Sequence, residues 1–294
     1  MMKKYSYYLL LLAGIYLLPA FTFNDTAYEE QIQQWHQKRI ESLKAESGWL
    51  NLAGLFWLDE GKNTFGGDSK NNVVFPADKS NPFLGEIWLD KGKVILKASP
   101  DAAIFSGDEP VTELDIFPDE KPVTLKHKSL RWFIIKRGDK YAVRLRDLES
   151  EYLKGFTGIE RYPVQEKWLV KARFEATTGK KVSITDITGR TADQESPGTL
   201  VFSVNGKEYR LDAVGSTKNL FIIFADQTNK KETYGAGRFL YTSVEEDGTA
   251  WLDFNKSINP PCAFSPFATC PLPPKQNKLA LAVSAGEKRY GDHE

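Results

Sequence analysis

Apolar residues recur at helical spacing only near the start of the chain. Four of them fall on one face of a helix, namely Ile32, Trp35, Ile40 and Leu43. The tetrapeptide TAYE at 26–29 has the pattern of a capping box, and Gly48 stops the apolar run. We therefore expect one amphipathic helix over residues 26–47.

Beyond Gly48 apolar and polar residues alternate, as in strands with one buried face. Turn residues at 136–140 and at Asn205-Gly206 each separate two alternating runs, which predicts two hairpins. Further strands are predicted by the apolar residues at 88–96, 182–184, 221–224 and 250–254. The fold class is therefore mainly β.

The order of the strands suggests two packed units, each a β-sandwich or barrel-like. Residues 48–160 would form the first β unit and residues 161–294 the second, with a glycine- and proline-bearing turn at 158–163 near the boundary. At 294 residues with 41% hydrophobic content, the chain is long and apolar enough for real cores.

The first 22 residues have the pattern of a secretory signal peptide. Two lysines precede an apolar region from Leu9 to Leu18, and small residues end the segment. Gly14 and Pro19 interrupt a run that is shorter than the roughly 20 residues a spanning helix needs, although retention as an uncleaved anchor stays open. We expect an exported protein, periplasmic or extracellular, with no stable membrane span after cleavage.

The charge balance disfavours one class of partner. The chain has 39 basic and 39 acidic residues, so there is no basic field that would attract nucleic acid.

A proline-rich segment at 252–274 contains both cysteines. Proline fixes φ and removes a backbone donor, so this segment is expected to be a stiff loop. In an oxidising compartment the simple expectation is a disulfide between Cys262 and Cys270. Two free thiols are the alternative, and no metal site is expected because no histidine lies at ligand spacing.

Arg144 and Arg146 alternate with apolar residues on the strand YAVRLRD at 141–147. Both arginines should therefore project from one face of a strand. Two arginines in this arrangement can hold a carboxylate or phosphate through bidentate hydrogen bonds. The alternative is a solvated sheet face with no ligand.

A second group of polar residues is expected where strands of the second unit end. Its members are Asp226, Tyr234, Arg238, Asp253, Asn255 and Asn259. If the strands are neighbours, these side chains converge beneath the proline loop, in a mouth suited to a sugar or another polyhydroxylated or anionic molecule. The simpler alternative is an Asp226–Arg238 pair that orders a hairpin.

The chemistry of this mouth is open at the sequence level. Asp226 and Asp253 could be the acid and base of a hydrolase if burial separated their pKa values. A binding protein without turnover and an interaction scaffold of the cell envelope are the other readings. No nucleophile elbow, phosphate loop or metalloprotease motif is present, and no cofactor is expected. The three histidines, His36, His127 and His293, are predicted to be solvated.

Five segments of the chain have a distinctive sequence: GWLNLAGLFWLDEGKNTFGG (48–67), YAVRLRD (141–147), GFTGIERYPVQEKWLVKARF (155–174), TYGAGRFL (233–240) and LDFNKSINPPCAFSPFATCPLPPKQNKLALAVSAGEK (252–288). Together they resemble the DUF1684 family of uncharacterised bacterial proteins. The resemblance extends over nearly all of the chain beyond the signal segment. It implies no activity, substrate or cofactor. The expectation of a small polar or anionic, sugar-like ligand in a C-terminal pocket therefore rests on the polar residues named above.

Overall fold

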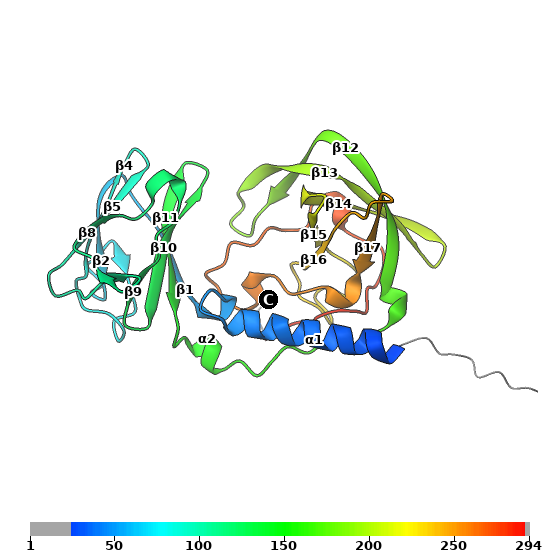
Figure 1. Ribbon diagram of the computed structural model, residues 1–294, viewed down its shortest axis with the longest axis horizontal. Coiled ribbons are helices and arrows are strands. Elements are labelled where there is room, and N and C mark those ends of the chain that lie inside the picture. Colours follow the sequence, from blue (N-terminus) through cyan, green and yellow to red (C-terminus); the bar gives the residue numbers. More distant parts are fainter. Residues whose placement is uncertain (1–24, 292–294) are drawn as a thin grey trace, which may run out of the picture.

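The computed structural model describes residues 25–291, as one N-terminal helix followed by two β units (Figure 1). The predicted signal peptide and His293 lie outside the described residues. The helix α1 (Asp25–Lys44) lies alongside the second unit and buries Ile32 and Leu43 completely. The mainly β fold class and the helix before it are confirmed.

The first unit is a sandwich of two sheets. One sheet has the order β1 (Leu52–Trp57), β11 (Lys140–Asp147), β10 (Leu130–Arg137), β9 (Leu125–His127), β6 (Phe105–Ser106) and β7 (Glu109–Pro110). The other has the order β3 (Val73–Val74), β2 (Gly61–Gly66), β4 (Gly85–Asp90), β5 (Lys93–Ala98) and β8 (Glu113–Asp115). Their facing side chains form one core, in which Phe65, Phe75 and Trp132 contact one another.

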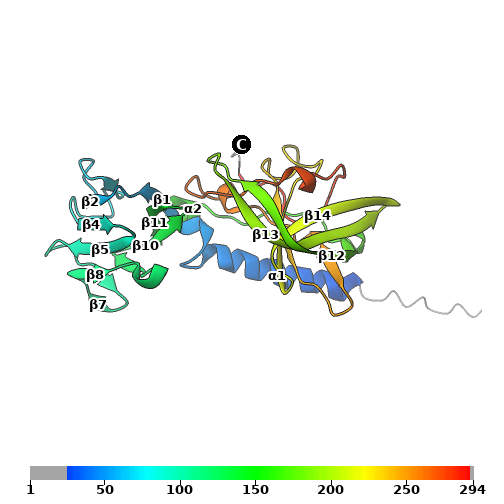
Figure 2. The same ribbon diagram turned by 90° about the horizontal axis from the view of Figure 1, so that it is seen from above.

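The second unit is a single curved sheet that forms a half-barrel (Figure 2). Its order is β16 (Arg238–Thr242), β15 (Asn219–Phe224), β14 (Lys207–Ser216), β13 (Thr191–Val204), β12 (Leu169–Thr185) and β17 (Thr249–Asp253). The two end strands, β16 and β17, lie close to each other. The Thr242 hydroxyl of β16 donates a hydrogen bond to the Trp251 carbonyl oxygen of β17 at 2.8 Å. The concave side holds an apolar core around Phe202, Phe224 and Phe254.

Both predicted hairpins are confirmed. Strands β10 and β11 form an antiparallel pair across the turn at Gly138. The turn between β13 and β14 is Asn205-Gly206, with φ values of 52° and 75°. Positive φ at both central residues is the requirement of the type I′ turn, which explains why this dipeptide predicted the hairpin.

Irregular chain covers the half-barrel after β17 and links it to the first unit. Within residues 254–291 it contains the short helices η4 (Phe254–Lys256), η5 (Pro261–Ala263) and η6 (Lys275–Asn277). The proline loop packs on the outer face of the sheet, where Ala268 and Cys270 contact Val214 and Ile223. Four short helices remain in residues 25–291. One precedes β1, η1 (Trp49–Asn51), and one precedes β9, η2 (Pro118–Glu120). The other two lie between the units, α2 (Glu151–Lys154) and η3 (Glu166–Trp168).

The sulfurs of Cys262 and Cys270 are at disulfide distance, and their Cα atoms are 6.1 Å apart. This geometry allows the predicted disulfide. A double Cys262→Ser/Cys270→Ser variant is expected to lose about 2–3 kcal/mol of unfolding free energy, because a short closed loop restricts the unfolded chain. Urea unfolding of the oxidised wild type and the variant measures this difference. Equal midpoints would show that packing alone holds the loop.

Candidate functional site

Asp226 and Arg238 form a closed ion pair. Asp226 follows β15, Arg238 begins β16, and Nη2 of the arginine lies 2.7 Å from Oδ2 of the carboxylate. Both side chains are 0% exposed. The other carboxylate oxygen accepts hydrogen bonds from the amide of Thr228 at 2.9 Å, from its hydroxyl at 2.6 Å, and from the amide of Val283 at 3.3 Å. Neither oxygen of Asp226 is left for a substrate.

The guanidinium of Arg238 is also buried, with partners for both Nη groups and none for Nε among the described residues. It donates to the carbonyl oxygens of Ala285 and, at 2.9 Å, Val283, and its Cζ lies 5.3 Å from the centroid of the Phe224 ring. Gly237 before it has φ +99°, and a Cβ there would lie 2.7 Å from the Phe224 carbonyl oxygen. The turn therefore needs glycine, as the sequence suggested, but it aims Arg238 into the protein interior.

Tyr234 is a packing residue. Its side chain is 7% exposed and lies in an apolar cluster with Leu43 of α1 and Phe264 of the proline loop. Burial raises the pKa of its phenol. The backbone carbonyl of Tyr234 accepts a hydrogen bond from the Asn229 amide at 2.8 Å, which fixes the turn between β15 and β16.

Asp253 and Asn255 bind the helix α1. The Tyr28 hydroxyl donates to Oδ1 of Asp253 at 2.7 Å and accepts from Nδ2 of Asn255 at 3.0 Å. Asn255 also bonds the backbone of Gln165 in both directions, at 2.9 and 3.1 Å. Burial and the Asp253 carboxylate raise the pKa of Tyr28, so this phenol stays protonated as a donor.

Asn259 belongs to a third buried group, with Glu287 and Arg39. Its backbone amide donates to Oε2 of Glu287 at 2.6 Å, and Nε of Arg39 lies 3.2 Å from Oε1. Burial raises the pKa of the Glu287 carboxyl, although Arg39 opposes this effect. No feature of the sequence marked Glu287 for burial, because it lies in a charged stretch close to the end of the chain.

Arg144 and Arg146 lie on one face of β11, as predicted, but that face is neither solvated nor open. Arg144 donates to the carbonyl oxygen of Phe267 in the proline loop, and Arg146 to that of Gly48. Burial first, and then the neighbouring Arg137 and Arg146, lower the pKa of Arg144 to about 10. These arginines join the first unit to the chain segments that flank it.

The six predicted residues of the second unit therefore lie in buried groups and do not form the rim of one cavity. Asp226, Tyr234 and Arg238 share one turn, and Asp253, Asn255 and Asn259 lie where the chain leaves β17. The two sets are linked through Phe224 and Phe254, whose ring centroids are 5.6 Å apart. Both oxygens of Asp226 have donors, which favours a structural role over acid–base chemistry. Asp253 accepts hydrogen bonds on Oδ1 only, and its buried Oδ2 lies 3.2 Å from Nζ of Lys256.

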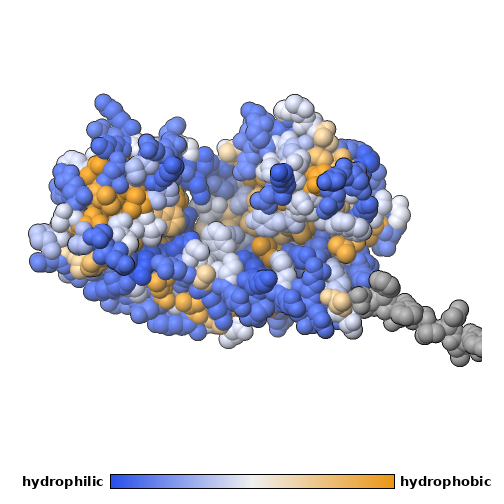
Figure 3. Space-filling view, in the orientation of Figure 1, coloured by the Kyte–Doolittle hydropathy of each residue, from blue (hydrophilic) through white to orange (hydrophobic). Residues whose placement is uncertain are grey.

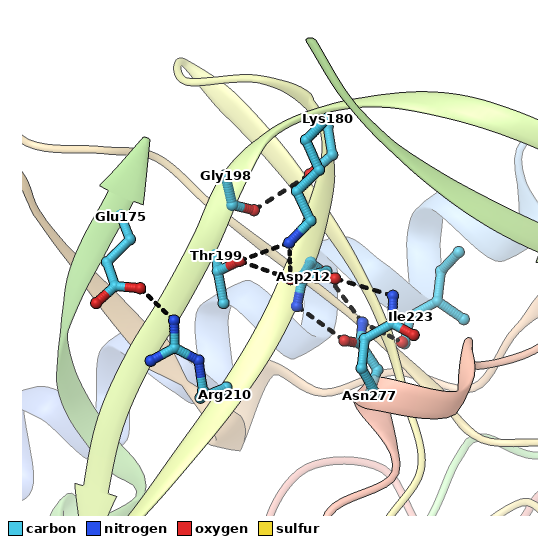
Figure 4. A network of polar contacts seen from close by, with 10 residues as sticks. Glu175, Lys180, Gly198, Thr199, Arg210, Asp212, Ile223 and Asn277 are labelled. Carbon is cyan, nitrogen blue, oxygen red and sulfur yellow. Dashed lines mark hydrogen bonds and ion pairs between the residues drawn. The ribbon is translucent and has the colours of Figure 1, made fainter. Parts of the chain in front are cut away.

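A further polar network was not predicted (Figure 4). The Asp212 carboxylate accepts hydrogen bonds from Lys180 at 2.5 Å, from the Thr199 hydroxyl at 2.6 Å and from Gln276 at 2.8 Å. Burial opposes ionisation of Asp212, but these donors outweigh it and lower its pKa. Asn277 joins Asp212 to the backbone of Ile223, so the network attaches η6 to the sheet.

A hollow of about 410 Å³ lies where the Asp226 turn meets the proline loop. Both segments contribute apolar residues to its lining, namely Ala225, Ala236, Leu272, Pro273 and Leu279. Two lysines, Lys230 and Lys278, also line it. Both lysines are exposed, and neither makes an ion pair within residues 25–291. We call this feature the Lys230–Lys278 hollow. Asp226 is the only predicted site residue in its lining.

Two searches for other chemistry concern the described residues alone. None of the helices in 25–291 is long and apolar enough to cross a membrane. The same part of the chain holds no cluster of three or more His, Cys, Asp or Glu side chains able to bind a metal ion.

The prediction that the histidines are solvated is wrong for His127, which is 2% exposed. Burial lowers its pKa, and burial together with Arg161 lowers that of His36. His127 lies between two lysines in the sequence, and this context gave no sign that its side chain points inward from β9.

Mild acid is expected to destabilise the protein through His36. Its folded pKa lies below the unfolded value of 6.5, so the unfolded state binds the proton first as the pH falls. Stability should decrease below about pH 6.5, until the folded pKa is passed. Urea unfolding between pH 7.5 and 5 should show a smaller decrease in His36→Gln. The difference between the two proteins isolates His36 from His127, whose lowered pKa acts in the same sense, and from Glu287, whose raised pKa acts in the opposite sense. A parallel decrease in both would contradict the assignment.

Comparisons with known proteins place one part of the chain. A family model described as a protein of unknown function, DUF1684, matches residues 154–288. No curated protein matches the chain. The solution NMR structure of an uncharacterized protein from Haloarcula marismortui is 29% identical, over 48% of this chain and 80% of that one, with a TM-score of 0.40. At this TM-score the likeness does not establish a shared fold.

Proposed function

Because residues 154–288 form a domain of the DUF1684 family, whose function is unknown, we propose a function from the geometry of that domain: it binds a small anionic molecule in the Lys230–Lys278 hollow, without turnover. The observation that carries the proposal is the pair of lysines at an otherwise largely apolar hollow. Every lining residue falls within the part of the chain that the family model matches.

The hollow suits a molecule with an acidic group and a compact apolar or sugar-like body. Leu272, Pro273 and Leu279 supply apolar contact, while Lys230 and Lys278 supply two cations. Ligand pockets commonly combine a mainly apolar lining with a few polar groups that fix orientation. The stiff proline loop and the hydrogen-bonded Asp226 turn hold the two walls before any ligand arrives, which reduces the ordering cost of binding.

The hydrolase reading has less support. Asp226 is saturated by Arg238, Thr228 and Val283. Asp253 accepts hydrogen bonds from Tyr28 and Asn255 on Oδ1, and its Oδ2 is buried beside Lys256. A general acid or base needs an oxygen that reaches the substrate. We place the protein in an exported, periplasmic or extracellular setting, where the Cys262–Cys270 pair would form and persist.

A thermal-shift screen tests the proposal. The probes are citrate, succinate, galacturonate and inorganic phosphate, with neutral galactose for comparison. At least one anion should raise the unfolding temperature in a concentration-dependent way, since a ligand that binds only the folded state stabilises it. Galactose should have little effect. A response to galactose as large as that to galacturonate would contradict an anion site.

A further inference from the structure

A second site lies between the two β units, at the tips of the β10–β11 and β12–β13 hairpins. Two hollows of about 670 and 400 Å³ meet there. Both are lined by Arg137, Gly138 and Arg190, so they lie side by side, and we treat them together as one cleft. Figure 3 shows a notch between the units with hydrophilic residues along it. We call this feature the inter-unit cleft; it shares no lining residue with the Lys230–Lys278 hollow.

Basic side chains reach the inter-unit cleft from both units. Lys136, Arg137 and Lys140 come from the first unit and Arg190 from the second. Within residues 25–291 only Lys136 among them makes an ion pair, with Glu120. The side chains of Arg137, Lys140 and Arg190 therefore have no carboxylate within 4.0 Å among the described residues, although Asp139 and Asp186 also line the cleft.

The position of Arg190 is defined by the opposite hairpin. A Cβ added at Gly138 would lie 3.2 Å from Nη2 of Arg190, so the glycine lets the guanidinium approach the turn. Arg144 lies behind this region, and its pKa is lowered by burial and then by Arg137. Positive charge is thus concentrated on both walls, where an anion would relieve it.

The same cleft also contains groups that suit a sugar. Trp57 is 47% exposed and offers an indole surface, which stacks on sugar rings. Thr188, Gln194 and Thr269 offer hydroxyl and amide groups. Asp139 and Asp186 can accept hydrogen bonds from hydroxyls, although Asp186 already accepts them from Thr188.

We propose that the inter-unit cleft binds a linear acidic oligosaccharide, with its carboxylates on Arg137 and Arg190 and a sugar ring on Trp57. Two acidic side chains in the cleft disfavour a ligand with dense phosphate charge, and the chain has no net charge to attract one. A sugar acid carries few charges and many hydroxyl donors. Its carboxylates can therefore pair with the arginines of the cleft, and its hydroxyls can donate to the aspartates. Bound in this way, it would hold the two units together.

The proposal is tested by calorimetric titration of the full protein with a galacturonate hexasaccharide. Maltohexaose and a short polyphosphate are the comparison ligands. The Arg137→Ala/Arg190→Ala variant is expected to weaken hexasaccharide binding at least about tenfold, because it removes charge-assisted hydrogen bonds. The matched control is Arg173→Ala/Arg210→Ala, which removes the same charge from an exposed pair around Glu175, outside the cleft.

The control variant and Lys230→Ala/Lys278→Ala should both bind the hexasaccharide as the wild type does. No detectable binding, or equal loss in the control, would overturn the proposed site. Polyphosphate binding more tightly than the hexasaccharide, or maltohexaose binding equally well, would overturn the proposed ligand class. Loss of binding in Lys230→Ala/Lys278→Ala alone would place the hexasaccharide in the other hollow.

Discussion

Replacing Arg238 by methionine is expected to lower the free energy of unfolding by about 3–5 kcal/mol. The substitution leaves the Asp226 carboxylate buried without its cation, and the carbonyl oxygens of Val283 and Ala285 without a donor. Methionine keeps an unbranched apolar side chain, so the loss reports mainly on the polar partners. Chemical denaturation followed by tryptophan fluorescence measures the change.

The matched control for this prediction is Arg210→Met. Arg210 also pairs with a carboxylate, that of Glu175, but the pair is exposed to solvent. Its removal should leave the denaturation midpoint nearly unchanged. If Arg238→Met had as small an effect as Arg210→Met, the ion pair would not be a structural element, and the interpretation of Asp226 would need revision.

Gly286→Ala is expected to cost about 2–4 kcal/mol, from backbone strain and steric overlap together. Gly286 has φ +77°, and a Cβ there would lie 2.5 Å from the Ser257 carbonyl oxygen and 2.8 Å from that of Phe254. The glycine therefore fixes the position of its two neighbours. Ala285 accepts a hydrogen bond from Arg238, and Glu287 accepts one from the Asn259 amide. Thermal and urea unfolding of the variant measure the cost.

Gly248→Ala separates strain from overlap. Gly248 has nearly the same φ, +75°, but no atom lies within 4 Å of a Cβ there. This variant should lose only about 1–2 kcal/mol, the cost of a left-handed residue alone. Equal losses in the two variants would show that the close approach at Gly286 is not required.

The sequence was informative wherever structure depends on neighbouring residues. Period-two alternation gave the hairpins, Asn205-Gly206 gave a turn that requires positive φ twice, and the short Cys262–Cys270 spacing gave the disulfide. In each case the physical cause lies within about ten residues of chain, so a local pattern records it.

The roles of the polar residues depended on distant partners. Asp253 meets Tyr28 across 225 positions, and Arg144 meets Phe267 across 123. The sequence placed the right residues at strand ends, but it could not show that their side chains are buried among partners inside the protein. It also gave no signal for the hollow at Lys230 and Lys278, because two exposed lysines in separate loops look like ordinary surface residues.

The structure contains two kinds of charged residue, one buried and one exposed. Buried charges such as Asp226, Asp212 and Glu287 attach loops and α1 to the half-barrel. Exposed cations at the Lys230–Lys278 hollow and at the inter-unit cleft form no ion pair among the residues described, and both groups are proposed to meet a ligand. Stability and binding should accordingly respond to different substitutions.

The most direct test is calorimetric titration of the anion that gives the largest thermal shift, against the wild type, Lys230→Ala/Lys278→Ala and the surface control Lys218→Ala. The dissociation constant should rise at least about tenfold in the double variant and stay unchanged in the control, with normal unfolding in both. Undiminished affinity in the double variant would contradict the proposed binding function of the hollow.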